Sequence, residues 1–306
     1  MMHHHFFGTL SDASSHEWRH STPTPFNELI VSWNSERPAQ GHFAIELSVH
    51  SNDAWSPWLR TAEWGASSQR GFVASAEFVS VNQDTIALTQ GRYGSAFAVR
   101  VLAKEGASLH ALRALHVCAS SLPHVASWTP IDTLGSGVLP VCGLSQMALA
   151  DPRKARVCSP TSLTAVLRFL CSALAVDPIQ FAESAWDADS DIFGNWSLNV
   201  AAAAALLGAK WACWAERLSG FGAALQHLQA GTPVVISVRG PLVGSAELYQ
   251  SGHLLVVKGF DAPRREVLCM DPAFPSDAAT DVRYPLEALL AAWERRGRLA
   301  YVCALV

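Results

Sequence analysis

The sequence predicts an α+β protein in two parts: an antiparallel β-sandwich, and then a domain with helices first and strands later. Short β-branched or alternating segments, separated by Gly, Asn, Asp and Pro, fill residues 26–118 and are typical of antiparallel sheets. A stretch rich in proline and glycine follows, after which apolar residues take helical spacing and then form strand-like runs. We therefore predict a sandwich over 26–120, a linker over 121–138 and a second domain over 139–306.

The first part begins with residues 1–25, which we interpret as a flexible tail because they carry no sustained apolar pattern. Three consecutive histidines at 3–5 could bind a metal, but a mobile polar tail is the favoured interpretation. Within the sandwich, "HFAIELSVH" alternates apolar and polar residues, as a half-buried strand does. One tryptophan-rich stretch is either core at the sandwich edge, which we favour, or a platform for sugars or peptides: Trp55, Trp58 and Trp64.

The second part should start with a helix that Ser159 caps and in which Pro160 takes the first position. Its apolar spacing runs from Leu163 to Leu174. The segment "NVAAAAALLGA" predicts a second helix closed by Gly208, and "GFGAALQHLQAG" a short third one. Four later segments read as strands of a largely buried sheet: "PVVISV", "HLLVVKGF", "EVLCM" and "AYVCALV".

Composition excludes several classes of protein. The formal net charge is −4 and only 16 % of residues are charged, so no nucleic-acid partner is expected. Seven cysteines, an odd number without a CxxC pair, argue against a disulfide framework and a thiolate zinc site. No apolar run reaches the ~18 residues of a membrane span, and no signal-peptide pattern opens the chain. We expect neither a membrane nor a metal or organic cofactor, and a cytoplasmic location.

Cys158 is the first candidate for chemistry. If Ser159 caps the helix, the Cys158 sulfur lies near the positive end of the helix dipole, which favours the thiolate. A thiolate is the nucleophile that acyl transfer needs. Cysteine is also among the most buried residue types, so a structural role is the alternative.

A base for this cysteine is found in a predicted hairpin. The segment "HLLVVKGF" turns at "DAPR" and returns as "EVLCMD", so a hairpin centred near residue 262 sets His253 directly opposite Asp271. A carboxylate there would hold the imidazole in one tautomer. Asp261 lies in the turn and cannot reach His253. Gln146, twelve residues before Cys158, could donate to an oxyanion, although a loop glutamine is more often only solvated.

Residues 139–306 resemble a peptidase-like family related to the bacteriocin-processing, double-glycine leader cysteine peptidases of the papain clan. The resemblance is carried, in order, by "LPVCGLSQ", "CSPTSLTAVLRFL", "GNWSLNVAAAAALLGA", "LQHLQAGTPVVISVRG", "SGHLLVVKGFD" and "VLCMDPAF". It implies a papain-like fold, peptide or protein substrates, and hydrolysis of peptide bonds through a thioester acyl-enzyme. It further implies Cys158 as nucleophile, His253 as general base and acid, Asp271 as the residue that orients His253, and Gln146 as oxyanion donor.

Three further residues are predicted to contact substrate. Trp196, with Asn195 beside it, would shape the wall of the substrate site, or else these are a core tryptophan and a helix cap. Gly252 would allow close backbone approach beside His253, or form an ordinary turn.

Other functions stay open at this stage. An acyltransferase would pass the thioester to an amine, and a binding or scaffold protein would keep the fold without turnover. The three tryptophans of the first part could also make that part a carbohydrate-binding module.

Overall fold

A computed structural model describes residues 2–7, 15–123 and 137–306. By contacts between Cα atoms the chain forms two compact units. One contains the described residues of Met1–Pro123 together with Trp186–Ala215 and Val306, and the other contains the described residues of His124–Ala185 together with Glu216–Leu305. The predicted linker falls almost entirely on 124–136, outside the described residues.

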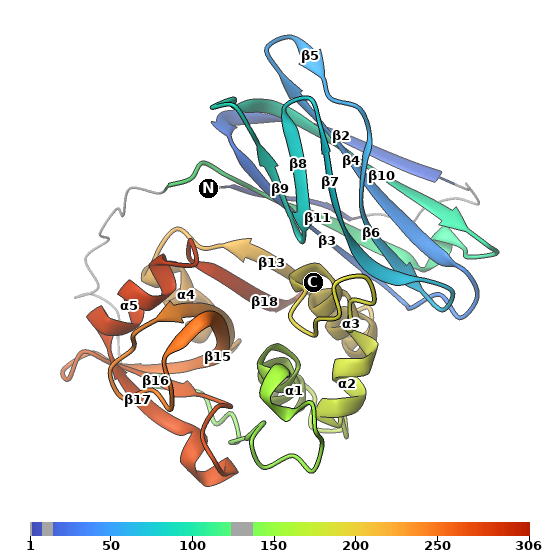
Figure 1. Ribbon diagram of the computed structural model, residues 1–306. Coiled ribbons are helices and arrows are strands. Elements are labelled where there is room, and N and C mark those ends of the chain that lie inside the picture. The colour runs from blue at the N-terminus through green and yellow to red at the C-terminus, as the bar shows by residue number, and fades with distance from the viewer. Residues whose placement is uncertain (1, 8–14, 124–136) are drawn as a thin grey trace. The chain divides into compact units, whose positions relative to one another are not determined.

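The first unit is built on an eleven-stranded antiparallel sheet (Figure 1). Its hydrogen-bonded path runs β1-β11-β3-β9-β8-β7-β6-β4-β10-β2, and β5 pairs with β4. The strands are β1 (Met2–Phe7), β2 (Ser15–Phe26), β3 (Glu28–Ser35), β4 (His42–Ser51), β5 (Ala54–Trp55), β6 (Leu59–Gly65), β7 (Gln69–Ala76), β8 (Val79–Gln83), β9 (Thr85–Leu88), β10 (Gly94–Lys104) and β11 (Leu112–Ser120). The antiparallel sheet is as predicted, but β7 pairs with both β6 and β8, so the strands form one continuous path, and a two-sheet sandwich stays a prediction.

Strand β4, predicted to be half-buried, is buried along nearly its whole length, polar residues included, and lies between β6 and β10. The inward residues Phe43, Ile45, Leu47 and Val49 of β4 are completely buried and belong to the core of the unit. The tryptophan-rich stretch divides between the two interpretations: Trp64 is completely buried against Trp33, whereas Trp55 is 38 % exposed. Trp64 is therefore core.

The flexible tail predicted for residues 1–25 is wrong for the described part of that segment, since both β1 and β2 are strands. β2 ends the hydrogen-bonded path beside β10. An end strand tolerates Pro23 and Pro25, which lack an N–H for the ladder, and these prolines disguised the strand in the sequence.

Helix α3 (Trp196–Leu207) belongs to the first unit, although the sequence predicts it as part of the 139–306 domain. Leu198 and Ala201 join the core of the sheet. Farther along the segment, the Asn34 side chain donates to the Cys213 carbonyl at 2.6 Å and accepts from its N–H at 3.0 Å. The helix ends at Gly208, whose φ of +76° suits glycine, as predicted.

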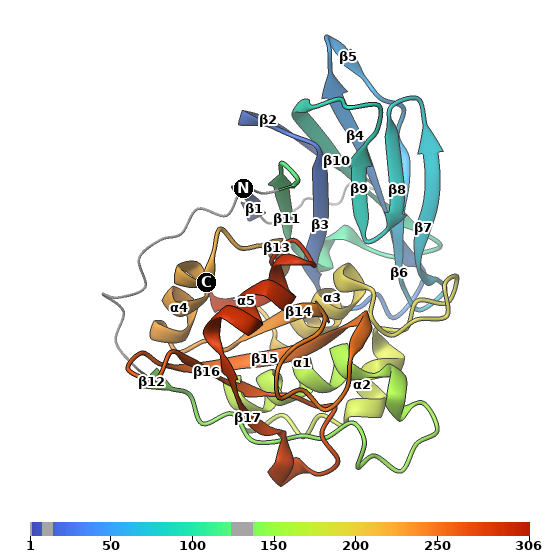
Figure 2. The ribbon, with the colours of Figure 1, turned by 60° about the vertical axis from the view of Figure 1, so that its left-hand side comes forward.

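The second unit combines helices with a second antiparallel sheet, and the strands predicted for it all form (Figure 2). Within the unit the strand order is β18-β14-β15-β16-β17, with β12 pairing with β15. The strands are β12 (Gly137–Val138), β14 (Val234–Gly240), β15 (Tyr249–Asp261), β16 (Glu266–Met270), β17 (Asp281–Pro285) and β18 (Leu299–Leu305). The helices are α1 (Cys158–Leu170), α2 (Pro178–Ser184), α4 (Phe221–Gln229) and α5 (Leu286–Glu294), and β13 (Trp211–Arg217) crosses the division between the units.

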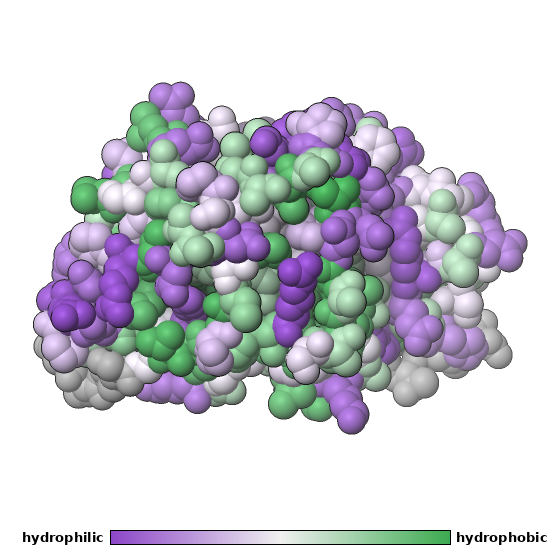
Figure 3. All heavy atoms as spheres, turned by 90° about the horizontal axis from the view of Figure 1, so that it is seen from below, coloured by the Kyte–Doolittle hydropathy of each residue, from purple (hydrophilic) through white to green (hydrophobic). Residues whose placement is uncertain are grey.

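The core of the second unit lies where α4 and α5 pack on the sheet, with Leu225, Leu289, Val257 and Trp293 among its buried residues. Helix α1 contacts β15 and β14, and Figure 1 shows it on the other side of β15 from α4 and α5. The face of the molecule in Figure 3 intersperses hydrophilic and hydrophobic residues. No helix among the described residues is long and apolar enough to cross a membrane.

Candidate active site

Helix α1 places Cys158 at its first position. The helix begins at Cys158, with Val157 as its N-cap residue and no side-chain cap. The predicted cap by Ser159 is therefore wrong, because the Ser159 hydroxyl instead forms a hydrogen bond with the hydroxyl of Tyr301 at 3.1 Å. The sulfur of a residue in the first turn still lies at the positive end of the helix dipole.

His253 lies on β15, and Asp271 immediately follows β16. The predicted register is wrong, because β16 ends at Met270, which pairs with Val256. Continuing that register would set Asp271 opposite Leu255, two residues from His253. An offset of two residues keeps both side chains on the same face, since side chains alternate along a strand.

A β-bulge at Lys258 makes this possible. On the turn side of Lys258 the register is Gly259 with Leu268, and beyond it the register is Val257 with Cys269. Without the extra residue, Asp271 would lie opposite Val256 and face away from His253. Strand β12 passes so close to Gly259 that a Cβ there would lie 2.6 Å from the carbonyl oxygen of Gly137; only glycine fits beside the bulge.

Cys158, His253 and Asp271 are connected by hydrogen bonds. The Nε2 atom of His253 lies 2.8 Å from Oδ1 of Asp271, and the His253 side chain forms a hydrogen bond with the Cys158 sulfur. Since Nε2 faces the carboxylate, Nδ1 is the nitrogen left for the sulfur. His253 is 4 % exposed, Asp271 is fully buried and Cys158 is half-buried.

Two tyrosines that the sequence analysis missed complete the surroundings of Asp271. The hydroxyls of Tyr249 and Tyr284 each donate to Oδ2 of Asp271 at 2.7 Å, and the N–H of Ala273 donates to Oδ1 at 3.0 Å. The ring of Tyr249 also stacks on His253, with centroids 4.1 Å apart. The buried carboxylate is thus fully hydrogen-bonded, as a buried charge must be.

The pKa values follow from these contacts. Burial alone would raise the pKa of the Cys158 thiol, but the hydrogen bond and charge of His253, with N–H groups of Leu254 and Ser159, lower it. Burial alone would lower the pKa of His253, yet the charge of Asp271 and hydrogen bonds to Asp271 and Cys158 raise it to about 10. Burial would likewise raise the pKa of Asp271, but His253 and both tyrosines lower it. These directions favour a thiolate beside an imidazolium.

Gln146 is held between the segments that carry the other three residues. Its backbone N–H donates to the carbonyl of Pro272, next to Asp271, at 2.9 Å. Its Nε2 donates to the carbonyl of Lys154, four residues before Cys158, at 2.9 Å. An amide nitrogen has two protons, so this side chain has one further N–H, and its role as oxyanion donor stays a prediction.

Gly252 lies in an irregular part of β15. Between the pairs Val238 with His253 and Gly240 with Tyr249, β15 contains two residues more than β14. Gly252 has a φ of +99° there, a conformation that favours glycine. Because of the two extra residues, Tyr249 pairs with Gly240, only two residues along β14 from the partner of His253. The ring of Tyr249 stacks on His253. Contact of Gly252 with substrate stays a prediction.

Asn195 and Trp196 lie in the first unit. Asn195 caps α3: its Oδ1 accepts from the N–H of Leu198 at 3.1 Å, and its Nδ2 donates to Asp187 at 2.8 Å. The Trp196 side chain is 8 % exposed. Asn195 is thus a helix cap and Trp196 a buried tryptophan, as in the alternative given above. Their contact with substrate stays a prediction. Among the residues that the structure describes, no group of three His, Cys, Asp or Glu side chains could hold a metal ion.

The site thus brings a cysteine on a helix beside a histidine and a buried carboxylate, in a strand-rich mixed fold with an antiparallel N-terminal sheet. Residues 138–301 match the model of the Peptidase_C39 like family, and residues 10–120 match that of the Peptidase C39 N-terminal domain. The chain belongs to the Peptidase_C39 like family.

Two solved structures resemble parts of the chain. One is a candidate C39-like peptidase from Bacillus anthracis, 20 % identical over 56 % of this chain and 98 % of its own, with a TM-score of 0.42. The other is xylellain, a cysteine protease from Xylella fastidiosa, 13 % identical over 60 % of this chain and 95 % of its own, with a TM-score of 0.36. No curated protein sequence matches the chain.

Proposed function

We propose that this protein is a cysteine peptidase that hydrolyses peptide bonds, with Cys158 as nucleophile. The observation that carries the proposal is the continuous hydrogen-bonded set Cys158–His253–Asp271, in which the carboxylate is completely buried. Membership of the Peptidase_C39 like family supports peptide or protein substrates. A papain-like arrangement for residues 139–306 and a β-sandwich for 26–120 belong to the same proposal.

In this mechanism the Cys158 thiolate attacks the scissile carbonyl carbon and forms a tetrahedral intermediate. The remaining Nε2 proton of Gln146 and the first N–H groups of α1 are the donors available to its oxyanion. The His253 imidazolium gives its Nδ1 proton to the leaving amine, which leaves a thioester on Cys158. Neutral His253 then takes a proton from water, whose hydroxide attacks the thioester carbon; the C–S bond breaks, the carboxylic acid product leaves, and the Cys158 thiolate and His253 imidazolium are restored. Asp271, held by its tyrosines, keeps the Nε2–H of His253 in place.

Alkylation of the cysteines tests the proposal without any substrate. An ordinary thiol, with a pKa of about 8.5, is less than about 1 % thiolate at pH 6. With limiting iodoacetamide at pH 6, we expect Cys158 to be alkylated at least about tenfold faster than exposed Cys142, as measured by peptide mass spectrometry. His253→Ala should abolish this lead. Equal rates for Cys158 and Cys142 in the unsubstituted protein would contradict a thiolate nucleophile.

The pH dependence of peptide cleavage gives a second prediction. The imidazolium must survive to protonate the leaving amine, and the pKa of His253 is raised to about 10. We expect kcat/KM to fall with a midpoint near pH 10 on the alkaline side. Between about pH 6.5 and about pH 10, His253 therefore keeps a proton in the folded protein that it loses in the unfolded chain. This contribution to the free energy of unfolding is complete below pH 6.5 and is lost as the pH rises through 10. An alkaline midpoint near pH 7 would contradict the assignment.

A further inference from the structure

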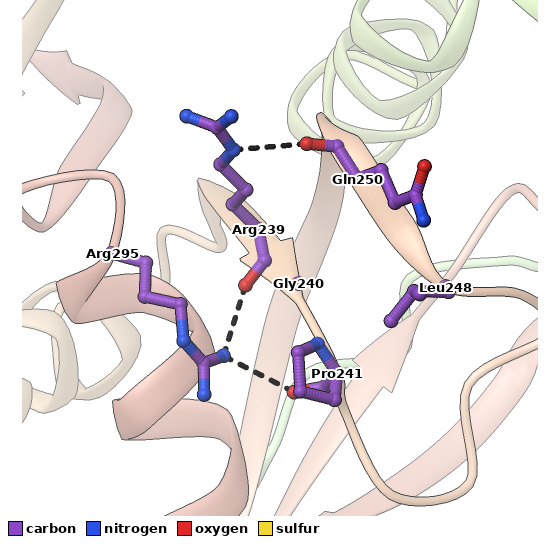
Figure 4. Close-up of a pocket in the computed structure, with 6 residues that line it drawn as sticks. All are labelled: Arg239, Gly240, Pro241, Leu248, Gln250 and Arg295. Atoms are coloured by element: carbon purple, nitrogen blue, oxygen red, sulfur yellow. Dashed lines mark hydrogen bonds between the residues drawn. The ribbon is translucent and has the colours of Figure 1, made fainter.

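A cavity lined by two arginines lies beside the strand that carries His253. It has a volume of about 590 Å³ and is lined by Arg239, Gly240, Pro241, Leu248, Gln250 and Arg295. Figure 4 shows the Arg295 guanidinium reaching from the end of α5 toward the start of the loop that leads to Leu248. The cavity is wide open to solvent, because all of its lining residues except Gly240 are exposed, but its volume is within the range of ligand sites.

The backbone fixes one side of each guanidinium. Nη1 of Arg295 donates to the carbonyls of Arg239 at 3.0 Å and Pro241 at 3.2 Å, and Nε of Arg239 donates to the carbonyl of Gln250 at 2.9 Å. A guanidinium has five N–H donors, so both arginines keep donors for a ligand, in positions that the backbone has already set.

Neither arginine has an acidic partner among the residues that the structure describes. No carboxylate in the described part of the chain lies within 4 Å of the Arg239 or Arg295 guanidinium: Glu294 pairs with Arg298 instead, at 3.2 Å, and Glu247, near Leu248 in sequence, forms no ion pair with either. Leu248, which is 52 % exposed, gives the cavity an apolar wall. Two cations and an aliphatic wall fit a carboxylate on a short aliphatic stem.

The cavity is close to His253 along the strand. Leu248 and Gln250 flank Tyr249, whose ring stacks on His253, and three residues from His253 to Gln250 span at most about 10 Å. His253 must reach the leaving nitrogen, so its surroundings face the part of the substrate that follows the cleaved bond. An extended peptide covers about 10 Å in three residues.

We infer that this cavity is a subsite for a peptide carboxylate two or three residues after the cleaved bond. The carboxylate is an acidic side chain or the free C-terminus of a short leaving segment. This inference rests on the proposed peptidase function and adds the substrate class to it.

The test compares matched peptides. Cleavage of a mixed peptide library, read by mass spectrometry, locates a cleaved bond. Peptides with Glu or Gln at the second and third positions after that bond, each as C-terminal acid and amide, are then compared by kcat/KM. We expect kcat/KM to be about tenfold higher for one carboxylate peptide than for its uncharged counterpart, the effect expected of one charge-assisted hydrogen bond. In the double variant Arg239→Gln/Arg295→Gln the ratio should fall to about one, and Arg264→Gln, at an exposed arginine of the same unit, should retain it.

Binding separates this inference from the proposed function. The same Glu and Gln forms, made as fluorescein-labelled hexapeptides when no bond is cleaved, are titrated against Cys158→Ala protein by fluorescence polarisation. A tenfold preference that the arginine variants lose supports the subsite even if hydrolysis fails. A ratio near one at every position and terminus, or a ratio that survives the double substitution, overturns it. A uniform loss for both forms at constant ratio also overturns it, because the arginines would then only hold the loop.

Discussion

Asp271→Asn is expected to lower kcat/KM at neutral pH at least about tenfold, since each unit by which a pKa shifts corresponds to a tenfold change in the ratio of the two protonation states. Asn can still accept a hydrogen bond from Nε2 of His253, but it offers no negative charge to an imidazolium. The pKa of His253 then falls and that of the Cys158 thiol rises, because each is shifted by the charge of its partner. Near neutral pH the variant therefore contains less thiolate and less of the imidazolium that protonates the leaving amine.

Two measurements check this expectation: kcat/KM on the peptide found by library cleavage, and the alkylation rate of Cys158 at pH 6. The matched control is Asp261→Asn, which removes a carboxylate that pairs with Arg264 and Arg283. Surface ion pairs contribute about 1 kcal/mol or less, so this control should change neither rate appreciably. If Asp271→Asn lowers kcat/KM less than tenfold and Cys158 keeps its lead, then Asp271 does not support the ion pair.

The sequence predicted which strands carry the site but not the details that align them. Alternation located the strand of His253, and a predicted hairpin brought Asp271 near it. The hairpin turns later than predicted, because Asp261 pairs with Glu266, and the bulge at Lys258 reduces the resulting register difference from three residues to two. That bulge lies where β12 crosses Gly259, a contact between segments about 120 residues apart in sequence. Local pattern contains no signal for such a contact.

Other differences have equally specific causes. Ser159 has a side chain that often caps a helix, but its hydroxyl bonds to the hydroxyl of Tyr301 and not to a backbone N–H of α1. Tyr249 and Tyr284 were missed because each is one aromatic residue in an otherwise ordinary strand. A signal existed for Tyr249: it lies four residues before His253 with Gly252 between them, and a glycine inside a strand often marks a bulge. Position 284 becomes recognisable only when β17 is paired with β16.

Removing both tyrosine hydroxyls should cost stability and the reactivity of Cys158 together. Each hydroxyl donates to Oδ2 of Asp271 at 2.7 Å. A hydrogen bond to a charged group contributes about 1.5–3 kcal/mol, so Tyr249→Phe and Tyr284→Phe should each lower the free energy of unfolding by about that amount. Together they leave Oδ2 without a partner in a site that water does not reach. The pKa of Asp271 then rises, which weakens its hold on the His253 proton.

Urea unfolding measures the first effect, and the pH dependence of Cys158 alkylation measures the second. Phenylalanine at 249 keeps the ring that stacks on His253, so only the hydroxyl is tested. The control is Tyr301→Phe, a buried hydroxyl bonded to Ser159 rather than to Asp271, which should lower stability without moving the alkylation midpoint. In the double variant the midpoint should move to higher pH. If stability falls while the midpoint stays, the tyrosines only fill the core. If both change, they are positioning residues that act on Cys158 through Asp271 and His253.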